Sequence, residues 1–298
     1  MIELSVAEAT SLLDPWLSSR SIESVDLMTG GLRNRNYHLR LRGRPSDAVL
    51  RFYDADPSAC AREVAVLGLL GRDCPVPRVL YVGDEDSATP HAVLSMVDGI
   101  ALRTLRELGG DDALAECASE AGKILNRLVQ YPGPPTPYET VVSLVERFVA
   151  APTFTARAGT GTARNLVALA ERWQPRLDEL SSSLGLVHGD FNSRNIFVKQ
   201  SVDGWRVSGI LDWEFALTAS PYCDIGNFLR YHTAERPRFE PHFSRGLRDG
   251  GMQLPPDWLA IARLMDLPAL CELVARPSLP DELVPELLTL LREQSPAI

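Results

Sequence analysis

The residues whose types and spacing could do chemistry lie in one stretch, residues 187–214. This stretch carries a His-Gly-Asp sequence that ends at Asp190, followed by Asn195 and Asp212. An Asp-Gly pair at 203–204 separates two alternating apolar runs, and such a pair is a strong signal for a two-residue hairpin turn. A turn at these residues pairs the two strands symmetrically about it, so the sequence predicts that Asn195 faces Asp212 at the open end of the hairpin.

An amide oxygen and a carboxylate held side by side are hard oxygen ligands, of the kind that hold Mg²⁺ beside substrate phosphates. Asp190 stands five residues before Asn195, in the loop that enters the same end of the hairpin. A carboxylate in that loop is placed to act as a general base. The stretch therefore predicts hard oxygen ligands for a magnesium ion at Asn195 and Asp212, with Asp190 in the place that a general base would occupy.

Simpler interpretations exist for single residues of this stretch. Asp and Asn are common in turns, so an isolated His-Gly-Asp would say little, and only the combination is specific. His188 follows an apolar strand and is expected to be a hydrogen-bonded structural residue. Glu214, two residues after Asp212, is either a third acid near the metal or substrate or a solvated residue at a strand end.

The pattern HGDxxxxN, followed by a hydrophobic strand and DW[DE], resembles the aminoglycoside phosphotransferase and choline kinase family, relatives of the protein kinases. The resemblance implies that Asp190 accepts the proton of the attacked hydroxyl and that Asn195 and Asp212 hold Mg²⁺. It also implies that His188 braces the catalytic loop. Asp224 resembles the family's helix-start aspartate, which anchors the loop or the helix N-terminus.

The same resemblance implies that the N-terminal part binds ATP or GTP. The turn sequence from Gly30 to Tyr37 is similar to the family's GGxxNxxY form, and residues 95–97 correspond to the hinge that contacts the base. The residues expected to contact the nucleotide in these two places are Gly30, Gly31, Asn34, Ser95, Met96 and Val97.

Because lysine is scarce, the sequence indicates which residue contacts the phosphates in the N-terminal part. Only Lys123 and Lys199 are lysines, so the lysine that kinases carry on their third strand is absent. Arg51 occupies its place, and Glu63 on the following helix is the expected partner. Arginine can bind phosphate and carboxylate groups in a bidentate manner, so it can fill this role, although a solvated strand arginine remains the alternative.

The elements that position these residues fall into two groups. Before Gly99, apolar alternation predicts about five strands and one helix, the helix beginning at Asp56 and Pro57. After Gly99, helices alternate with one island of strands at 186–212. The predicted helices are 111–130, 138–150, 161–180, 221–233, 256–275 and 280–293. The expected fold is α+β, a protein-kinase-like bilobal fold with a nucleotide-binding lobe at 1–97 and a catalytic and substrate-binding lobe at 98–298.

Composition limits the partners. A net charge of −9 makes binding to nucleic acid or to an anionic membrane surface unexpected. No apolar run is long enough to span a bilayer, and the first residues lack the basic start of a secretory signal. The five cysteines are widely spaced without a CxxC pair, which favours a reducing, cytoplasmic setting. A monomer or a homodimer is expected.

The acceptor is expected to be the hydroxyl of a small molecule, and an antibiotic of the aminoglycoside type is the first hypothesis. The second half is mildly acidic, which is compatible with a cationic acceptor without requiring one. A metabolic kinase acting on choline, a sugar, a fructosamine or homoserine is the alternative, and a catalytically silent nucleotide-binding regulator is another. The acids considered for acceptor binding are Asp249, Asp257, Asp266 and Glu272.

Overall fold

The computed structural model describes residues 4–28, 33–71, 73–84, 89–108, 110–180, 184–231 and 239–294. The chain forms two compact units. The first contains residues up to Leu105 together with Arg194–Ala216, and the second contains Arg106–Ser193 and the residues from Leu217 onward. The hairpin predicted around residues 203–204 was expected in the lobe at 98–298. It belongs instead to the first unit, because Arg194–Ala216 is part of that unit.

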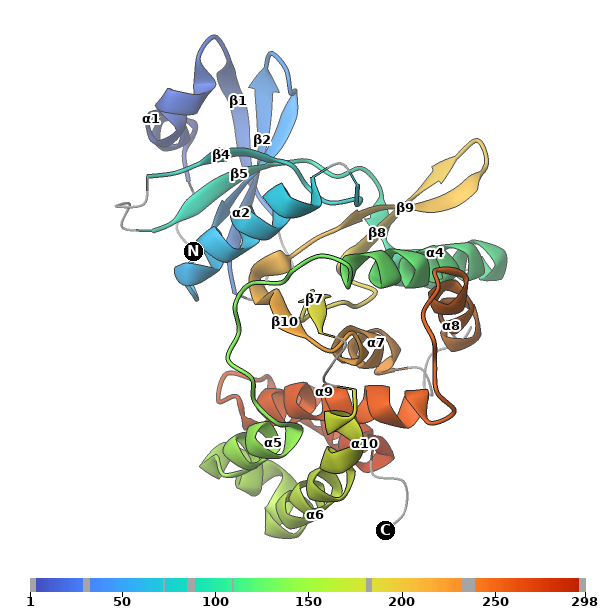
Figure 1. Cartoon of the computed structure of the whole chain (residues 1–298). Coiled ribbons are helices and arrows are strands. Elements are labelled where there is room, and N and C mark those ends of the chain that lie inside the picture. Colours follow the sequence, from blue (N-terminus) through green and yellow to red (C-terminus); the bar gives the residue numbers. More distant parts are fainter. Residues whose placement is uncertain are drawn as a thin grey trace. The chain divides into compact units, whose positions relative to one another are not determined.

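The first unit is built on a five-stranded antiparallel sheet of order β1-β2-β3-β5-β4 (Figure 1). The strands of this sheet are β1 (Ser21–Leu27), β2 (Arg35–Arg42), β3 (Asp47–Phe52), β4 (Val79–Val82) and β5 (His91–Ser95). They confirm the five strands predicted before Gly99. The predicted helix is also present as α2 (Ser58–Leu70), where Asp56 Oδ1 accepts a hydrogen bond of 3.0 Å from the Ser58 N–H.

A second helix of this unit, α1 (Val6–Leu17), corrects the prediction of a single helix. Ser5 and Glu8 form a reciprocal capping box at its start, which satisfies backbone N–H groups that the first turn would leave unpaired. Its Leu13 and Trp16 pack on one face of the sheet, against side chains that include Leu50 of β3. Side chains alternate along a strand, so Arg51 projects from the other face.

The catalytic hairpin consists of β8 (Ile196–Ser201) and β9 (Gly204–Ile210), and β6 (Ile100–Ala101) pairs with β8. Its turn is formed by Val202 and Asp203, because Gly204 already pairs with Ser201. The prediction of a turn at 203–204 was therefore wrong by one residue.

A bulge between Phe197 and Val198 then shifts the register back by one residue toward the predicted pairing. As a result, the Leu211 N–H donates to the Asn195 carbonyl oxygen at 2.9 Å. Asn195 lies opposite Leu211, and the predicted pairing with Asp212 is corrected to the neighbouring residue.

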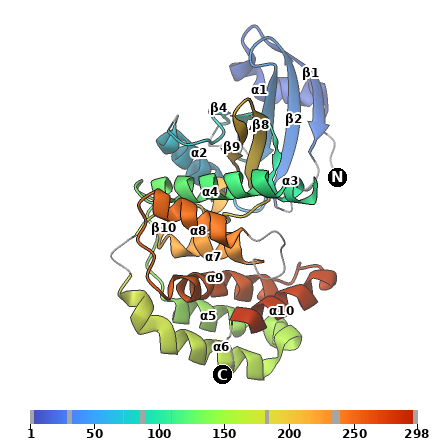
Figure 2. The same cartoon turned by 90° about the vertical axis from the view of Figure 1, so that its right-hand side faces the viewer.

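The second unit is mostly helical, and Figure 2 shows its helices as stacked layers. Helix α8 packs on α4, while α9 contacts α5, α6, α7 and α10. The helices are α4 (Asp111–Leu128), α5 (Val141–Val149), α6 (Pro152–Asp178), α7 (Tyr222–Leu229), α8 (Glu240–Asp249), α9 (Trp258–Ala275) and α10 (Val284–Gln294). Two short strands, β7 (Gly185–Val187) and β10 (Leu217–Ala219), pair beside them.

These helices follow the prediction with two exceptions. Helix α6 starts at Pro152, before the predicted residue 161, and Gly159 interrupts it with a φ of 83°. Helix α8 was not predicted, and neither was α3 (Leu102–Leu108), which follows β6. No helix in the described ranges combines the length and the apolarity that a bilayer crossing requires.

Candidate active site

The Arg51 side chain is the centre of a charged cluster in the first unit. Its Nε lies 3.2 Å from Glu63 Oε2, and both side chains are almost fully buried. The predicted pairing between β3 and α2 is therefore present in the structure. Tyr53, which sequence reasoning missed, donates its hydroxyl to Glu63 Oε2 at 2.6 Å, and the Arg51 guanidinium lies over its ring.

Burial raises the pKa of Glu63 above its ordinary value, and the positive charge of Arg51 opposes this rise. Burial also disfavours the charged form of Arg51, but the carboxylates of Glu63 and Asp212 outweigh it and raise the pKa of the guanidinium. Each partner thus offsets part of the cost of burying the other.

Asp212 joins the same cluster. The Arg51 Nη2 donates to Asp212 Oδ1, and the next residue, Trp213, donates its N–H to Glu63 Oε1 at 3.0 Å. Asp212 has a left-handed backbone, with a φ of 72°. Asp and Asn adopt this conformation more readily than most residues other than glycine. Its side chain is 31% exposed, which leaves the carboxylate partly open to a ligand.

Glu214 and Asn34 complete the cluster. The Asn34 Nδ2 donates to Glu214 Oε2 at 2.8 Å, and both residues are buried. Glu214 is therefore not a solvated strand-end residue. Burial and the nearby Asp212 raise the pKa of Glu214. Gly30 and Gly31, predicted in the same turn as Asn34, lie outside the described residues.

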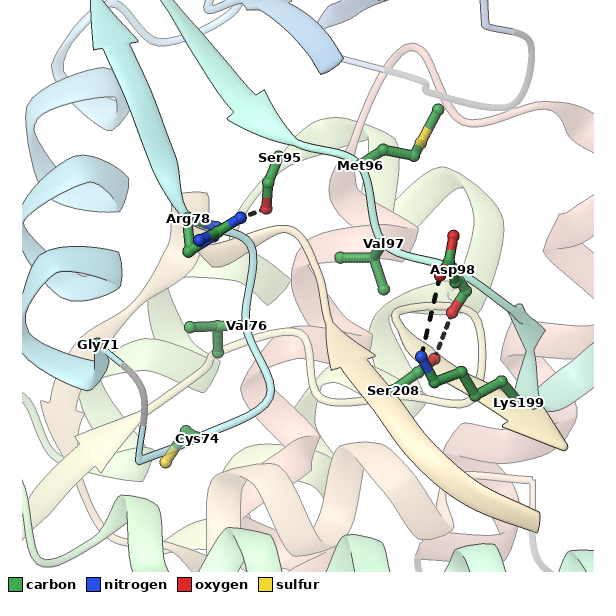
Figure 3. Close-up of a pocket in the computed structure, with 10 residues that line it drawn as sticks. All are labelled: Gly71, Cys74, Val76, Arg78, Ser95, Met96, Val97, Asp98, Lys199 and Ser208. Atoms are coloured by element: carbon green, nitrogen blue, oxygen red, sulfur yellow. Dashed lines mark hydrogen bonds and ion pairs between the residues drawn. The ribbon is translucent and has the colours of Figure 1, made fainter. Parts of the chain in front are cut away.

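The hinge residues lie in a different part of the first unit. Ser95, Met96 and Val97 line a cavity of about 340 Å³, to which Arg78 and Lys199 also contribute (Figure 3). The cluster around Arg51 is not part of its lining. Behind the hinge, the Ser208 hydroxyl donates to the Asp98 carbonyl oxygen at 2.6 Å, and the Ser95 N–H donates to the Arg78 carbonyl oxygen at 2.8 Å.

Met96 and Val97 differ from their neighbours in their backbone groups. Within the described ranges, no hydrogen bond engages the backbone N–H or carbonyl of either residue. Backbone groups that have no protein partner can pair with a ligand. This segment therefore offers both donors and acceptors to the edge of a base.

The catalytic loop lies in the second unit, where Asp224 holds its backbone. Asp224 Oδ2 accepts the His188 N–H at 2.7 Å, and Oδ1 accepts the Gly189 N–H at 3.0 Å. His188 Nδ1 accepts the Asp190 N–H at 3.1 Å, so the ring proton is on Nε2. The structure thus places His188 and Asp224 where residues that support the loop would lie.

Asp190 has one side-chain partner that sequence reasoning missed. The Asn192 Nδ2 donates to Asp190 Oδ1 at 2.8 Å, and it also contacts the Asp190 carbonyl oxygen at 3.2 Å. The spacing of two residues is typical of local turns made by such side chains, and this signal could have identified Asn192. The bond fixes the orientation of one carboxylate oxygen of Asp190.

The buried Asp224 makes the stability of the second unit depend on pH. Burial raises the pKa of Asp224 to about 7 from an ordinary 3.8, although the N–H bonds from His188 and Gly189 oppose the rise. Because the folded state binds this proton more tightly than the unfolded chain, stability is greatest at low pH and falls as pH rises through about 4 to 7.

Between pH 5 and pH 8, this one group is expected to lower the free energy of unfolding by about 2 kcal/mol. Asp224→Asn cannot ionise and should lack this slope, although it loses one of the two N–H bonds at every pH. Urea unfolding of both proteins at several pH values measures the difference. Parallel stability curves would contradict the assignment of a raised pKa to Asp224.

The residue types and placement fit Mg²⁺. Asp212 and Asn195 supply hard oxygens at the end of the hairpin, and Asp212 Oδ2 has no protein partner within the described ranges. The same ranges contain no group of three or more His, Cys, Asp or Glu side chains arranged as a complete metal site. A magnesium ion that is also held by substrate phosphates needs only one or two protein carboxylates, so these ligands suffice.

Solved structures with the same fold are phosphotransferases. A GDP complex of aminoglycoside 2'-phosphotransferase-IIIa is 19% identical, with a TM-score of 0.77, and the match covers 97% of this chain and 98% of that one. A thermostable mutant of aminoglycoside phosphotransferase APH(4)-Ia with AMP-PNP and hygromycin B is 16% identical, with a TM-score of 0.65 over 92% and 94% of the chains. These likenesses confirm the predicted kinase-like fold.

Sequence comparison gives a family. Among curated proteins, a probable acyl-CoA dehydrogenase, IBR3 of Arabidopsis thaliana, is 32% identical over 78 residues, which is 26% of this chain and 9% of that protein. The chain thus matches about a tenth of the length of this relative. The model of the phosphotransferase enzyme family matches residues 25–264, which include the charged cluster, the hinge and the catalytic loop. The chain therefore belongs to the phosphotransferase enzyme family.

Proposed function

We propose that the protein transfers the γ-phosphate of ATP or GTP to the hydroxyl of a small molecule, with Asp190 as the general base. The observation that carries this proposal is the anchored loop, in which Asp224 and His188 fix the backbone on either side of Gly189. Asp190 takes the proton of the hydroxyl, whose oxygen attacks the γ-phosphorus while the bond to the leaving nucleoside diphosphate breaks.

Asn195 and Asp212 would hold Mg²⁺, which supplies positive charge to the phosphates when it is bound. Five residues of chain separate Asp190 from Asn195, and five residues span at most about 18 Å. Chain connectivity therefore limits the separation of the base and the metal ligand Asn195 to about 18 Å.

Arg51 would contact the phosphates of the nucleotide, and Glu63 would hold its guanidinium in place. The free backbone groups of Met96 and Val97 would bind the base edge. The bound GDP and AMP-PNP in the structural neighbours support a nucleotide as phosphate donor. Without Arg51, no other basic side chain of β3 could take this role, since the strand contains no second arginine or lysine.

The acceptor was first expected to be an aminoglycoside-type antibiotic, and hygromycin B in one neighbour keeps this hypothesis open. The acids considered for a cationic acceptor are, however, all ion-paired. The pairs are Asp249 with Lys123, Asp257 with Arg176, Asp266 with Arg230 and Glu272 with Arg276. Asp266 is buried with Arg230, so a cationic acceptor would have to displace a guanidinium there. This observation favours the second candidate, a metabolic kinase for a neutral or anionic hydroxyl compound.

A panel of hydroxyl compounds tests both candidates. Purified protein is incubated with ATP or GTP, Mg²⁺ and either aminoglycosides, neutral sugars, choline, homoserine or hydroxy acids, and acceptor-dependent release of ADP or GDP is measured. Stimulation by sugars, choline, homoserine or hydroxy acids supports a metabolic kinase, and stimulation by aminoglycosides supports the antibiotic hypothesis. Tight nucleotide binding without turnover on any acceptor class would favour the silent regulator.

The metal assignment predicts that Asp212→Asn weakens nucleotide binding only when Mg²⁺ is present. The substitution suits the left-handed backbone, so the loss should reflect the missing charge and not strain. Titration calorimetry with a non-hydrolysable nucleotide, with Mg²⁺ and with EDTA, gives the two affinities. A variant that keeps the full magnesium dependence of the wild type would rule Asp212 out as a ligand.

A further inference from the structure

The bond between Asn34 and Glu214 joins two segments that are far apart in the sequence. Asn34 immediately precedes β2, and Glu214 follows Asp212 by two residues, in the short 3-10 turn Trp213–Phe215. The bond is short, at 2.8 Å, and its members are 8% and 3% exposed. A buried hydrogen bond to a charged group is among the stronger polar interactions in a protein.

The Glu214 carboxylate holds more than one partner. Its Oε1 lies 3.8 Å from Arg33 Nε and also 3.8 Å from Arg51 Nη2. The Arg33 guanidinium lies over the ring of Phe215, in the same turn as Glu214. Glu214 therefore sits between the residues that enter β2 and the arginine that is expected to bind phosphate.

The segment that carries Asp212 is held along its backbone as well. The Trp213 N–H donates to Glu63, and Arg62 Nη1 donates to the Glu214 carbonyl oxygen. Asp212 itself has the left-handed backbone described above. A residue in such a conformation keeps it only when its surroundings fix it, and these contacts fix the two residues that follow Asp212.

The Asn34 amide is oriented by its partner. An ionised carboxylate only accepts, so Nδ2 must face Glu214, and Oδ1 remains a buried acceptor without a partner within the described ranges. Phosphate oxygens are acceptors too, and Oδ1 gains nothing from meeting them. Direct phosphate binding by Asn34 would therefore depend on the second N–H of Nδ2 alone, because the first is held by Glu214.

We infer that Asn34 and Glu214 are positioning residues. Their hydrogen bond acts as a lock that holds the residue before β2 against the segment that carries Asp212. The lock aligns Asp212 and Arg51 for a nucleotide. Asn34 and Glu214 themselves touch neither the phosphates nor the metal. The inference rests on the proposed function, because it concerns the same nucleotide site. It replaces the earlier expectations that Asn34 binds the nucleotide and that Glu214 contacts the metal or substrate.

Exchanging donor and acceptor tests the lock. Glu214→Gln keeps a carbonyl oxygen for the Asn34 Nδ2, so nucleotide affinity should stay within about three-fold of the wild type. Asn34→Asp places two carboxylates together and should weaken binding by roughly ten-fold or more. In the double variant N34D/E214Q, the new amide can donate to the new carboxylate, which should restore binding and the Tm.

The measurements are the Kd for a non-hydrolysable nucleotide with Mg²⁺ and the Tm of the nucleotide-free protein. Asn126→Asp is the matched control, since Asn126 donates to the Gly250 carbonyl oxygen in the second unit and should leave nucleotide affinity unchanged. Recovery in the double variant supports the lock.

If Glu214→Gln alone abolishes magnesium-dependent binding and the double variant does not recover, Glu214 is a metal ligand and the inference is wrong. Unchanged affinity in Asn34→Asp would also overturn it. A wild type that binds no magnesium nucleotide would instead defeat the proposed function, which is a different result from either of these.

Discussion

Asp190→Asn is expected to lower kcat by about 10²- to 10⁴-fold and to leave nucleotide affinity unchanged. The range is that of losing a positioned general base. The substitution preserves the local structure, because the Asn192 Nδ2 can still donate to the amide oxygen at residue 190. Steady-state kinetics on the acceptor found by the panel, together with nucleotide titration, separates loss of chemistry from loss of binding.

The matched control is Asp203→Asn, which makes the same change of acid to amide in the exposed turn of the catalytic hairpin. This variant should keep the kcat of the wild type. If Asp190→Asn keeps more than about half of the wild-type kcat, another group removes the proton and the role assigned to Asp190 is wrong.

Arg51→Ala is expected to reduce the free energy of unfolding by about 3–5 kcal/mol, the usual cost of breaking a buried ion pair on one side. The buried carboxylate of Glu63 would lose its closest cation, and Asp212 and Glu214 would lose theirs as well. Arg51→Lys keeps the charge but cannot reach Glu63 and Asp212 with separate N–H groups, so it should recover only part of the loss. Urea unfolding measures both variants.

A double variant separates the structural and binding roles of Arg51. In R51A/E63Q, the buried charge of Glu63 is removed together with its partner, so much of the lost stability should return. Nucleotide affinity should remain low, because the phosphate contact is still missing. If the double variant binds nucleotide as tightly as the wild type, Arg51 is only a structural residue.

The chemistry-bearing residues could be found from the sequence because their signals are local. Asp190 and Asn195 stand in one loop, and the absence of any lysine before residue 123 leaves Arg51 as the basic residue of β3. Glu63 lies on the helix that follows β3, where the resemblance implies the partner of the basic residue, and the structure places it against Arg51.

The register of the hairpin could not be found in this way. Alternating apolar residues fit several turn positions equally well, and the choice between 202–203 and 203–204 depends on the backbone of Gly204, whose φ is 113°. The bulge beside Phe197 leaves no mark in the pattern, since it inserts a residue without changing its type. Register depends on packing of the whole sheet, which a local pattern does not contain.

Two other misses have different causes. The capping box of Ser5 and Glu8 was visible in the sequence, and α1 could have been predicted from it. The cluster formed by Asn34, Arg51 and Glu214 was not visible, because its members are 180 residues apart at the extreme and meet only through the tertiary fold. Sequence patterns place residues on elements, but they do not say which elements touch.

The division of the chain into units has a consequence for synthesis on the ribosome. The first unit needs Arg194–Ala216 to be complete, although residues 106–193 of the second unit are made before them. Domains usually fold in the order in which they are translated, but here neither unit can finish before the hairpin has emerged. Until then Glu63 lacks the Trp213 N–H and Arg51 lacks Asp212, so the charged cluster around Arg51 is completed only after residue 213 has been made.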